Sequence, residues 1–347
     1  MRVLVTGHKG YIGTCLVPLL LNEGYEVTGL DSDLYRDCTY DGAIADVPEI
    51  VKDVRDVTPK DIEGHDAVIH LAGLSNDPLG DYDPSLTDDI NCQGSVRVAM
   101  LAKEVGVKRF VFASSCSNYG AAGDNFLTED AEFNPVTPYG VSKVNVERAV
   151  APLADKNFSP IFLRASTAYG VSPRLRFDLV VNNLTAWALT TGKVFLKSDG
   201  SPWRPIVHVE DIGRAYVAAL KAPLELVHNQ AFNVGTTTEN YQIREIASIV
   251  ESVVPGCRVD FAADAGPDKR NYRVDCNRIA RTLHGFKPQW TARRGVEQLY
   301  EAFKRSGLTL DDFEGERYKR IAHVKKLVNA GHLDSRLRWT NAGAAAR

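Results

Sequence analysis

The sequence predicts an α/β fold in which a doubly wound parallel sheet carries a smaller mixed α/β domain. Two observations predict it. The first 31 residues read as strand, glycine-rich loop, helix, strand and acid. After them, short apolar runs alternate with helical patterns as far as Arg164, and this alternation indicates βαβ units and therefore a parallel sheet.

The first strand, residues 2–6, is apolar and rich in β-branched residues, and it leads directly into a G-x-x-G-x-x-G loop. Glycine permits a tight turn and lets the backbone come close to a pyrophosphate. The following helix, expected from near Tyr11 and Ile12, points unpaired N–H groups and its positive dipole end at that charge. We therefore expect Gly7, Gly10 and Gly13 to cradle a phosphate.

The second strand, residues 26–30, delivers Asp31 eighteen residues past Gly13. An acid about 20 residues beyond the loop binds the ribose hydroxyls of a dinucleotide. A carboxylate accepts from a 2′-hydroxyl and repels a 2′-phosphate, so Asp31 favours NAD over NADP, although Arg36 follows closely. Together these features predict a Rossmann-type, NAD-binding domain.

Further buried strands are predicted at residues 67–71, 109–113 and 160–164, with a helix between the first two and another from Thr137-Pro138. Ligands bind beyond the carboxyl ends of parallel strands, so Gly73, Ser75 and Ser115 are expected to line one crevice. We assign residues 1–170, with a return segment at about 205–237, to the Rossmann domain. Residues 171–204 and 238–330 form the substrate-binding domain, and 331–347 a tail; nothing after Gly307 signals a function.

Composition excludes several classes of protein. The 347 residues carry a formal charge of −3, with 44% hydrophobic and 24% charged residues, which argues against a nucleic-acid or anionic membrane partner. Six cysteines without a C-x-x-C pair disfavour a metal site or a disulfide framework. No apolar run is long enough to span a bilayer. A cytoplasmic location is expected.

Tyr139 and Lys143 are four residues apart on a predicted helix and so share one face. A neighbouring ammonium favours the anionic form of a tyrosine hydroxyl, which then serves as a general base. Ser115, at the end of the fifth strand, can hydrogen-bond to the same reacting oxygen. An isolated Y-x-x-x-K is usually a surface pair, but this one stands beside a predicted dinucleotide site.

With these residues in place, the chain resembles the extended short-chain dehydrogenase/reductase family, specifically its nucleotide-sugar epimerases and dehydratases, from Met1 to about residue 305. Thr6 to Gly13 match the glycine motif, His70 to Gly73 match H-x-A-G, and Asn91 to Gly94 match N-x-x-G. Ser115, Tyr139 and Lys143 match the catalytic triad. The resemblance implies a cofactor site that includes Asp31, Asp53, Val54, Leu71, Ala72, Gly73 and Asn91.

The resemblance also implies a substrate site for a nucleoside diphosphate sugar. Gly200 to Asp211 match G-x-x-x-R-x-x-x-H-V-x-D, which puts Arg204 on the diphosphate. Asn183 and Arg270 resemble two further diphosphate residues, and Arg174 and Arg176 fit this role and a structural one equally well. Asn233 and Gly235 match F-N-x-G. Sugar contacts are expected at Ser75, Cys116, Ser117 and Thr167.

In this family a hydride leaves the sugar, usually from C4, while the tyrosine takes the hydroxyl proton. Dehydratases place acids at the two positions after the catalytic serine or threonine, which are Cys116 and Ser117 here. The sequence therefore favours a C4 epimerase with NAD returned to its oxidised state. The alternatives are an NAD(P)H-dependent 4-ketosugar reductase, a 3,5-epimerase using Cys116, a dehydratase and a non-catalytic NAD sensor. The resemblance further implies a homodimer formed by the helices after Asn91 and Pro138.

Overall fold

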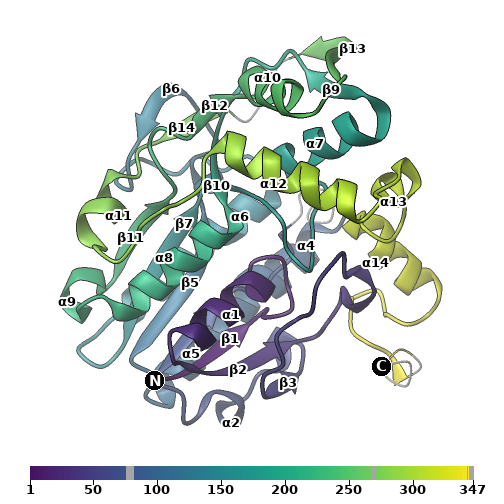
Figure 1. Cartoon of the computed structure of the whole chain (residues 1–347). Coiled ribbons are helices and arrows are strands. Elements are labelled where there is room, and N and C mark those ends of the chain that lie inside the picture. Colours follow the sequence, from purple (N-terminus) through teal and green to yellow (C-terminus); the bar gives the residue numbers. More distant parts are fainter. Residues whose placement is uncertain (76–81, 267–270, 342, 344–347) are drawn as a thin grey trace.

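The computed structural model describes residues 1–75, 82–266, 271–341 and 343. A seven-stranded sheet lies at its centre in the order β11-β7-β5-β4-β1-β2-β3, and all its pairings are parallel (Figure 1). The chain winds outward from β1 in both directions, so the predicted doubly wound Rossmann sheet is confirmed. Its strands are β1 (Arg2–Thr6), β2 (Glu26–Asp31), β3 (Glu49–Val51), β4 (Ala67–His70), β5 (Arg109–Ser115), β7 (Ser159–Ala165) and β11 (Gln230–Val234).

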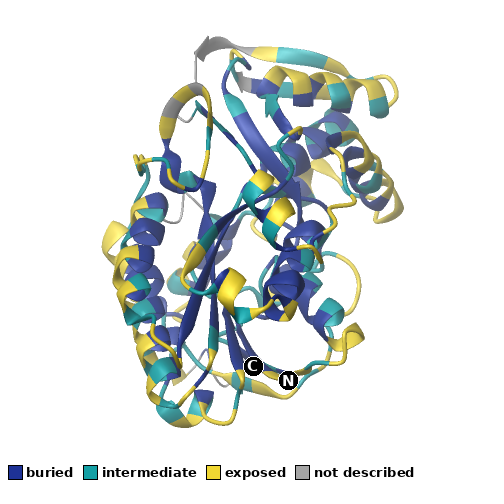
Figure 2. Ribbon diagram, turned by 90° about the vertical axis from the view of Figure 1, so that its left-hand side faces the viewer, coloured by how far each residue is buried: buried dark blue, intermediate teal, exposed yellow. Residues whose placement is uncertain are grey.

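Helices cover both faces of this sheet because its strands are apolar on both sides. Val3 and Val5 point into one core with α1 (Gly13–Asn22) and α8 (Val209–Lys221). Leu4, between them, points to the other face, where α5 (Gly94–Glu104) and α6 (Pro138–Val150) pack. The strands are accordingly buried along most of their length (Figure 2).

A third core lies beyond the carboxyl ends of the strands. It is built by α7 (Val180–Thr191), α10 (Ile243–Val253) and α12 (Ala292–Arg305), which Figure 1 shows above the large sheet. Three small sheets accompany them: β8 (Thr167–Tyr169), β10 (Trp203–His208) and β12 (Asn240–Gln242); β9 (Lys193–Ser198) and β13 (Arg258–Gly266); β6 (Ala121–Leu127) and β14 (Asn271–Val274).

The remaining elements are short, apart from one helix near the C-terminus. That helix, α14 (Arg320–Asn329), packs through Val324 and Leu327 into the core of the α5/α6 face, and Leu333 and Leu337 follow it there. No helix of the described ranges is long and apolar enough to cross a bilayer. The others are η1 (Arg36–Cys38), η2 (Val54–Asp56), α2 (Pro59–Ile62), α4 (Pro84–Thr87), η3 (Asp88–Gln93), η4 (Cys116–Tyr119), η5 (Ala151–Leu153), α9 (Leu224–Val227), α11 (Asn277–Thr282) and α13 (Leu310–Glu314).

Two elements differ from the sequence-based expectation. Helix α1 begins at Gly13 rather than near Tyr11, because the loop before it closes as a turn in which the Gly10 N–H donates to the Gly7 carbonyl at 3.0 Å. The chain returns to the large sheet through α8 and β11, whereas β10 pairs with β8 and β12. Ile206 packs into the third core instead.

Candidate active site

A pocket of about 730 Å³ runs along the carboxyl ends of the strands, from the glycine loop to the third core. It gathers most of the site residues that the sequence predicts. Those that line it are Gly7, Gly10, Tyr11, Ile12, Gly13, Asp31, Asp53, Val54, Leu71, Ala72, Gly73, Ser75, Ser115, Ser117, Tyr139, Lys143, Thr167 and Arg204.

The glycine loop is packed too closely to admit side chains. A Cβ on Gly7 would lie 2.7 Å from the Ala72 nitrogen, and Gly7 has φ +73°, which disfavours other residues. A Cβ on Gly13 would lie 2.4 Å from the Gly7 carbonyl oxygen. These contacts leave backbone N–H groups and the start of α1 facing the pocket, which is the arrangement that holds a pyrophosphate. The loop therefore fits a dinucleotide.

Asp31 ends β2 at the same end of the pocket. Its two carboxylate oxygens accept from the Lys9 N–H at 3.0 Å and the Asp33 N–H at 2.8 Å, so the carboxylate is fixed in orientation. Burial raises the pKa of Asp31, and the two backbone N–H groups oppose that shift. Asp53 is close by and is held by Arg55, whose Nη2 donates to it at 2.6 Å. This end suits a ribose with free hydroxyls.

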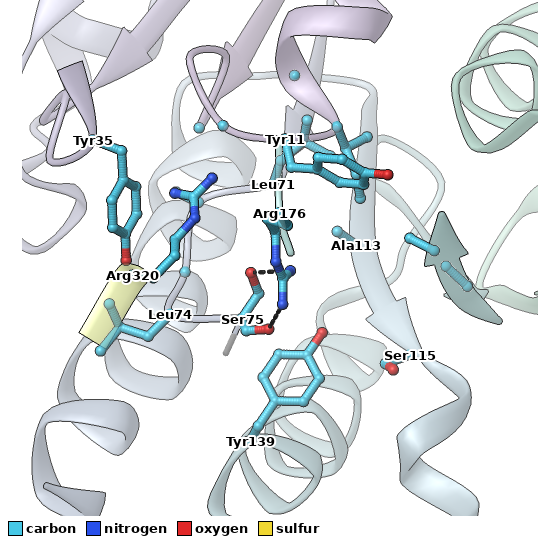
Figure 3. Close-up of a pocket in the computed structure, with 18 of the residues that line it drawn as sticks. Tyr11, Tyr35, Leu71, Leu74, Ser75, Ala113, Ser115, Tyr139, Arg176 and Arg320 are labelled. Carbon is cyan, nitrogen blue, oxygen red and sulfur yellow. Dashed lines mark hydrogen bonds between the residues drawn. The ribbon is translucent and has the colours of Figure 1, made fainter. Parts of the chain in front are cut away.

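The predicted catalytic residues meet at the other end of the pocket. Ser115 is the last residue of β5, and Tyr139 stands in the first turn of α6, which Thr137 caps and Pro138 begins. Figure 3 shows the Tyr139 hydroxyl inside the pocket, between Ser115 and Ser75. The Lys143 ammonium lies one helical turn on, 5.5 Å from the centre of the Tyr139 ring. Burial lowers the pKa of Lys143 to about 8.

A buried ion pair between Arg164 and Glu147 anchors helix α6 to the sheet, and sequence analysis did not predict it. The Arg164 Nη2 and Glu147 Oε2 atoms are 2.6 Å apart, and both side chains are almost fully buried. Glu147 also accepts from Ser114, next to the catalytic serine. The signal was present in the spacing, since Tyr139, Lys143 and Glu147 recur every four residues along one helix face.

The substrate end of the pocket is assembled from separate elements. Thr167 begins β8, and Arg204, from β10, lies with its guanidinium 6.0 Å from the centre of the Tyr272 ring. Arg176 also lines this end and is fixed by several hydrogen bonds. It donates to the Ser75 hydroxyl at 2.9 Å, to the Ser75 carbonyl at 2.8 Å and to Asp178 at 2.6 Å (Figure 3).

The pocket lining does not include three residues predicted to bind cofactor or substrate, apart from Arg174 and Asn233, which are also absent from it. Asn91 is buried and exchanges hydrogen bonds with the Leu74 backbone at 2.7 and 2.8 Å, so it positions the loop after β4. The side-chain amide of Asn183 donates to the Phe177 carbonyl. Cys116 is fully buried, and its thiol donates to the Arg164 carbonyl at 3.1 Å. A fourth, Arg270, falls outside the described residues.

Two other predicted residues have structural partners. Arg174 pairs with Asp33 at 2.9 Å, which supports the structural role for this arginine. Asn233 accepts from the Tyr119 hydroxyl at 2.8 Å in the interior. Within the described part of the chain, no group of three or more His, Cys, Asp or Glu side chains is placed to hold a metal ion.

The C-terminal segment supplies pocket residues that sequence analysis did not predict. Arg320, from α14, and Leu337 both line the pocket, and the Arg320 guanidinium lies 3.7 Å from the centre of the Tyr35 ring. A signal exists in hindsight, because Arg320, His323, Val324 and Leu327 form one buried stripe at helical spacing. An arginine within such a stripe marks a buried charge that needs a partner.

Comparison with known proteins identifies the family of this chain. The sequence profile of the NAD dependent epimerase/dehydratase family matches residues 3–235. The chain belongs to this family. The predicted family, the enzyme class and the NAD cofactor are thereby confirmed, and the glycine loop and Asp31 fit that cofactor.

Relatives extend the likeness to residues beyond the range that the family profile matches. UDP-glucose 4-epimerase of Bacillus subtilis is 29% identical, with 86% of this chain and 94% of the relative aligned. UDP-glucose 4-epimerase of Lactobacillus helveticus is 30% identical, with 83% of this chain and 92% of the relative aligned. Among solved structures, MoeE5 in complex with UDP-glucuronic acid and NAD is 28% identical, with a TM-score of 0.77, over 88% of this chain and all of that one.

Proposed function

We propose that this family member is an NAD-dependent nucleotide-sugar epimerase that inverts C4 of a nucleoside diphosphate hexose through a 4-keto intermediate. The observation that carries the proposal is the convergence of Ser115, Tyr139 and Lys143 in one pocket that also holds Asp31 at its far end. UDP-glucose 4-epimerases among the relatives support the reaction class.

Each side chain of this site has a separate role in a reversible oxidation of the sugar. NAD supplies a hydride acceptor and later the hydride that returns to the sugar. Tyr139 takes the proton of the reacting hydroxyl, and the positive charge of Lys143 favours the anionic tyrosine that does so. Ser115 hydrogen-bonds the same oxygen and keeps it in line with Tyr139. Arg204 is placed to hold the diphosphate.

The carboxylates of the pocket argue against dehydration. Among its described lining residues, the acids are Asp31, Asp33, Asp53 and Asp178. Asp31 and Asp33 stand at the end of β2, Asp53 follows β3, and Asp178 is paired with Arg176 at 2.6 Å. The two positions after Ser115 offer a thiol and a hydroxyl, and burial raises the pKa of Cys116 to about 12. Within the described part of the pocket lining, no acid stands beside the triad to serve in loss of water.

The test is turnover of a panel of UDP-, dTDP-, GDP- and CDP-sugars in heavy water, with and without added NADH, followed by chromatography, mass spectrometry and proton NMR. We expect a new C4 epimer of unchanged mass without added NADH. A requirement for NADH would instead establish a ketosugar reductase. Deuterium at C3 or C5 would establish enolisation, and loss of 18 mass units a dehydratase.

We also propose a homodimer formed through α5 and α6. These helices pack against one another and leave apolar side chains outside, with Met100 56% and Val141 42% exposed. Val144 and Val150 are buried and take no part. Sedimentation should give twice the chain mass, and Met100→Glu with Val141→Glu should give monomers.

The proposed location is the cytoplasm. All six cysteines are free thiols, four of them buried, as suits a protein that folds in a reducing compartment.

A further inference from the structure

Arg320 is a buried cation that faces the cofactor pocket from the C-terminal helix. Its side chain is only 7% exposed, and it begins α14 on the α5/α6 side of the sheet. One nitrogen donates to the Arg174 carbonyl at 3.1 Å, and the guanidinium lies over the Tyr35 ring. Figure 3 shows the guanidinium turned inward, toward Leu71 and Arg176, below the glycine loop.

Arg320 differs from three other pocket cations, Lys9, Lys52 and Arg176, because it forms no ion pair with a described carboxylate. Lys9 is paired with Asp33 at 3.1 Å, Lys52 with Asp61 at 2.7 Å and Arg176 with Asp178 at 2.6 Å. Among the described residues, no carboxylate lies within 4.0 Å of the Arg320 nitrogens. A buried cation without an anion is costly, so the site calls for an anionic ligand.

The environment of Arg320 also favours an anionic ligand. Burial lowers the pKa of Arg320 and the charge of Arg176 lowers it further, while Tyr35 and the more distant Asp178 only partly oppose this shift. Both guanidiniums line the same pocket, so an anion placed between them would relieve their repulsion as well as the burial cost. Arginine suits this task because its planar fork donates two parallel hydrogen bonds to phosphate oxygens.

The C-terminal segment is firmly attached to the loop that follows Asp31. The Trp339 indole N–H donates to the Ser32 carbonyl at 2.7 Å, and His323 is 3.1 Å from the Leu34 carbonyl oxygen. The Arg36 guanidinium stacks over Trp339 at 4.4 Å. These contacts fix helix α14, and with it Arg320, against the loop that follows β2.

We propose that Arg320 binds the pyrophosphate of NAD opposite the glycine loop, which makes the segment from α14 to Trp339 part of the cofactor site. The loop contributes backbone N–H groups from β1 and α1, and Arg320 contributes the charge that those groups lack. This inference rests on the NAD dependence of the family and not on which sugar is turned over.

The test compares Arg320→Met and Arg320→Lys with Lys326→Met, a control on the same helix whose side chain is 64% exposed and pairs with Glu316. The dissociation constants of NAD, ADP-ribose and UDP are measured by calorimetry on protein stripped of NAD. We expect Arg320→Met to weaken NAD and ADP-ribose alike by about ten- to a hundredfold, the range for a charge-assisted hydrogen bond. The dissociation constants of Arg320→Lys for NAD and ADP-ribose should lie between those of wild type and Arg320→Met. The dissociation constants of Lys326→Met, and those of every variant for UDP, should change less than about twofold.

Thermal unfolding separates binding from folding. Without ligand, Arg320→Met should unfold at the same or a higher temperature than wild type, because a buried unpaired charge has been removed. Saturating NAD should raise the unfolding temperature of Arg320→Met by less than it raises that of wild type. Unchanged NAD affinity would overturn the proposal, as would weaker UDP binding in place of weaker NAD binding. These binding measurements contain no sugar, so failure of the epimerase assay would leave them standing.

Discussion

The two halves of the pocket are built differently. In the cofactor half, most of the residues sit in short motifs at the ends of adjacent parallel strands, and backbone groups hold them. Asp31 is fixed by two backbone N–H groups, and the Ala72 backbone leaves no room for a side chain at Gly7. In the substrate half, Thr167, Arg176 and Arg204 come from separate segments, and side-chain pairs such as Arg176 with Asp178 hold them.

This difference indicates which part of the pocket can accept amino-acid substitutions. A site held by backbone contacts cannot change its ligand without changing the fold, whereas a site held by side chains can be altered one residue at a time. The relatives are consistent with this view. They include both UDP-glucose 4-epimerases and TunA, an NAD dependent-NDP-hexosamine 5,6-dehydratase that is 25% identical with a TM-score of 0.78.

The largest effect is expected from Tyr139→Phe, at the junction of the two halves. Loss of the general base should lower kcat by about 100- to 10,000-fold, while NAD binding stays near the wild-type value. Steady-state kinetics and calorimetry measure the two quantities. Turnover at the wild-type rate would disprove the assigned chemistry.

Gly7→Ala tests the claim that backbone contacts hold the cofactor half. The new Cβ would lie 2.7 Å from the Ala72 nitrogen at a φ of +73°, so we expect a loss of about 2 kcal/mol or more in unfolding free energy. Gly24→Ala is the matched control, since it has φ +78° and nothing within 4 Å. The control should lose only about 1 kcal/mol. Equal losses would mean that the close contact does not matter.

Arg204→Met tests the substrate half alone. Removing a charge that binds the diphosphate should raise KM for the nucleotide sugar by about ten- to a hundredfold. NAD affinity and unfolding temperature should be unaffected if the halves are independent. A parallel loss of NAD binding would show that they are coupled.

Lys143→Met tests whether the buried charge of Lys143 lowers the stability of the folded protein. The pKa of Lys143 falls from 10.5 to about 8 in the folded protein, so the unfolded chain holds the proton more tightly between these pH values. Wild-type stability should therefore rise with pH from about 8 to 10.5. The variant should lack this rise and be more stable than wild type at pH 7, by about 1 to 2 kcal/mol. Denaturant titrations at pH 7 and pH 10 measure the difference; a variant less stable at pH 7 would contradict it.

The smallest effect is expected from Cys116→Ser, which keeps a donor for the Arg164 carbonyl. Because the thiol is fully buried and faces away from the pocket, turnover should change less than about twofold and stability by about 1 kcal/mol. A hundredfold loss of kcat with unchanged stability would return Cys116 to the catalytic site and favour 3,5-epimerisation.

Sequence patterns were enough to predict the large sheet, the glycine loop, Asp31 and the triad, because each depends on neighbours within a few residues or on one strand end. Only the tertiary structure separated Cys116 and Asn183 from the pocket, since a shift of one residue turns a side chain from a cavity into a core. It alone brought Arg320 beside residues nearly three hundred positions away. Such contacts depend on packing between distant elements, for which a single sequence carries no local signal.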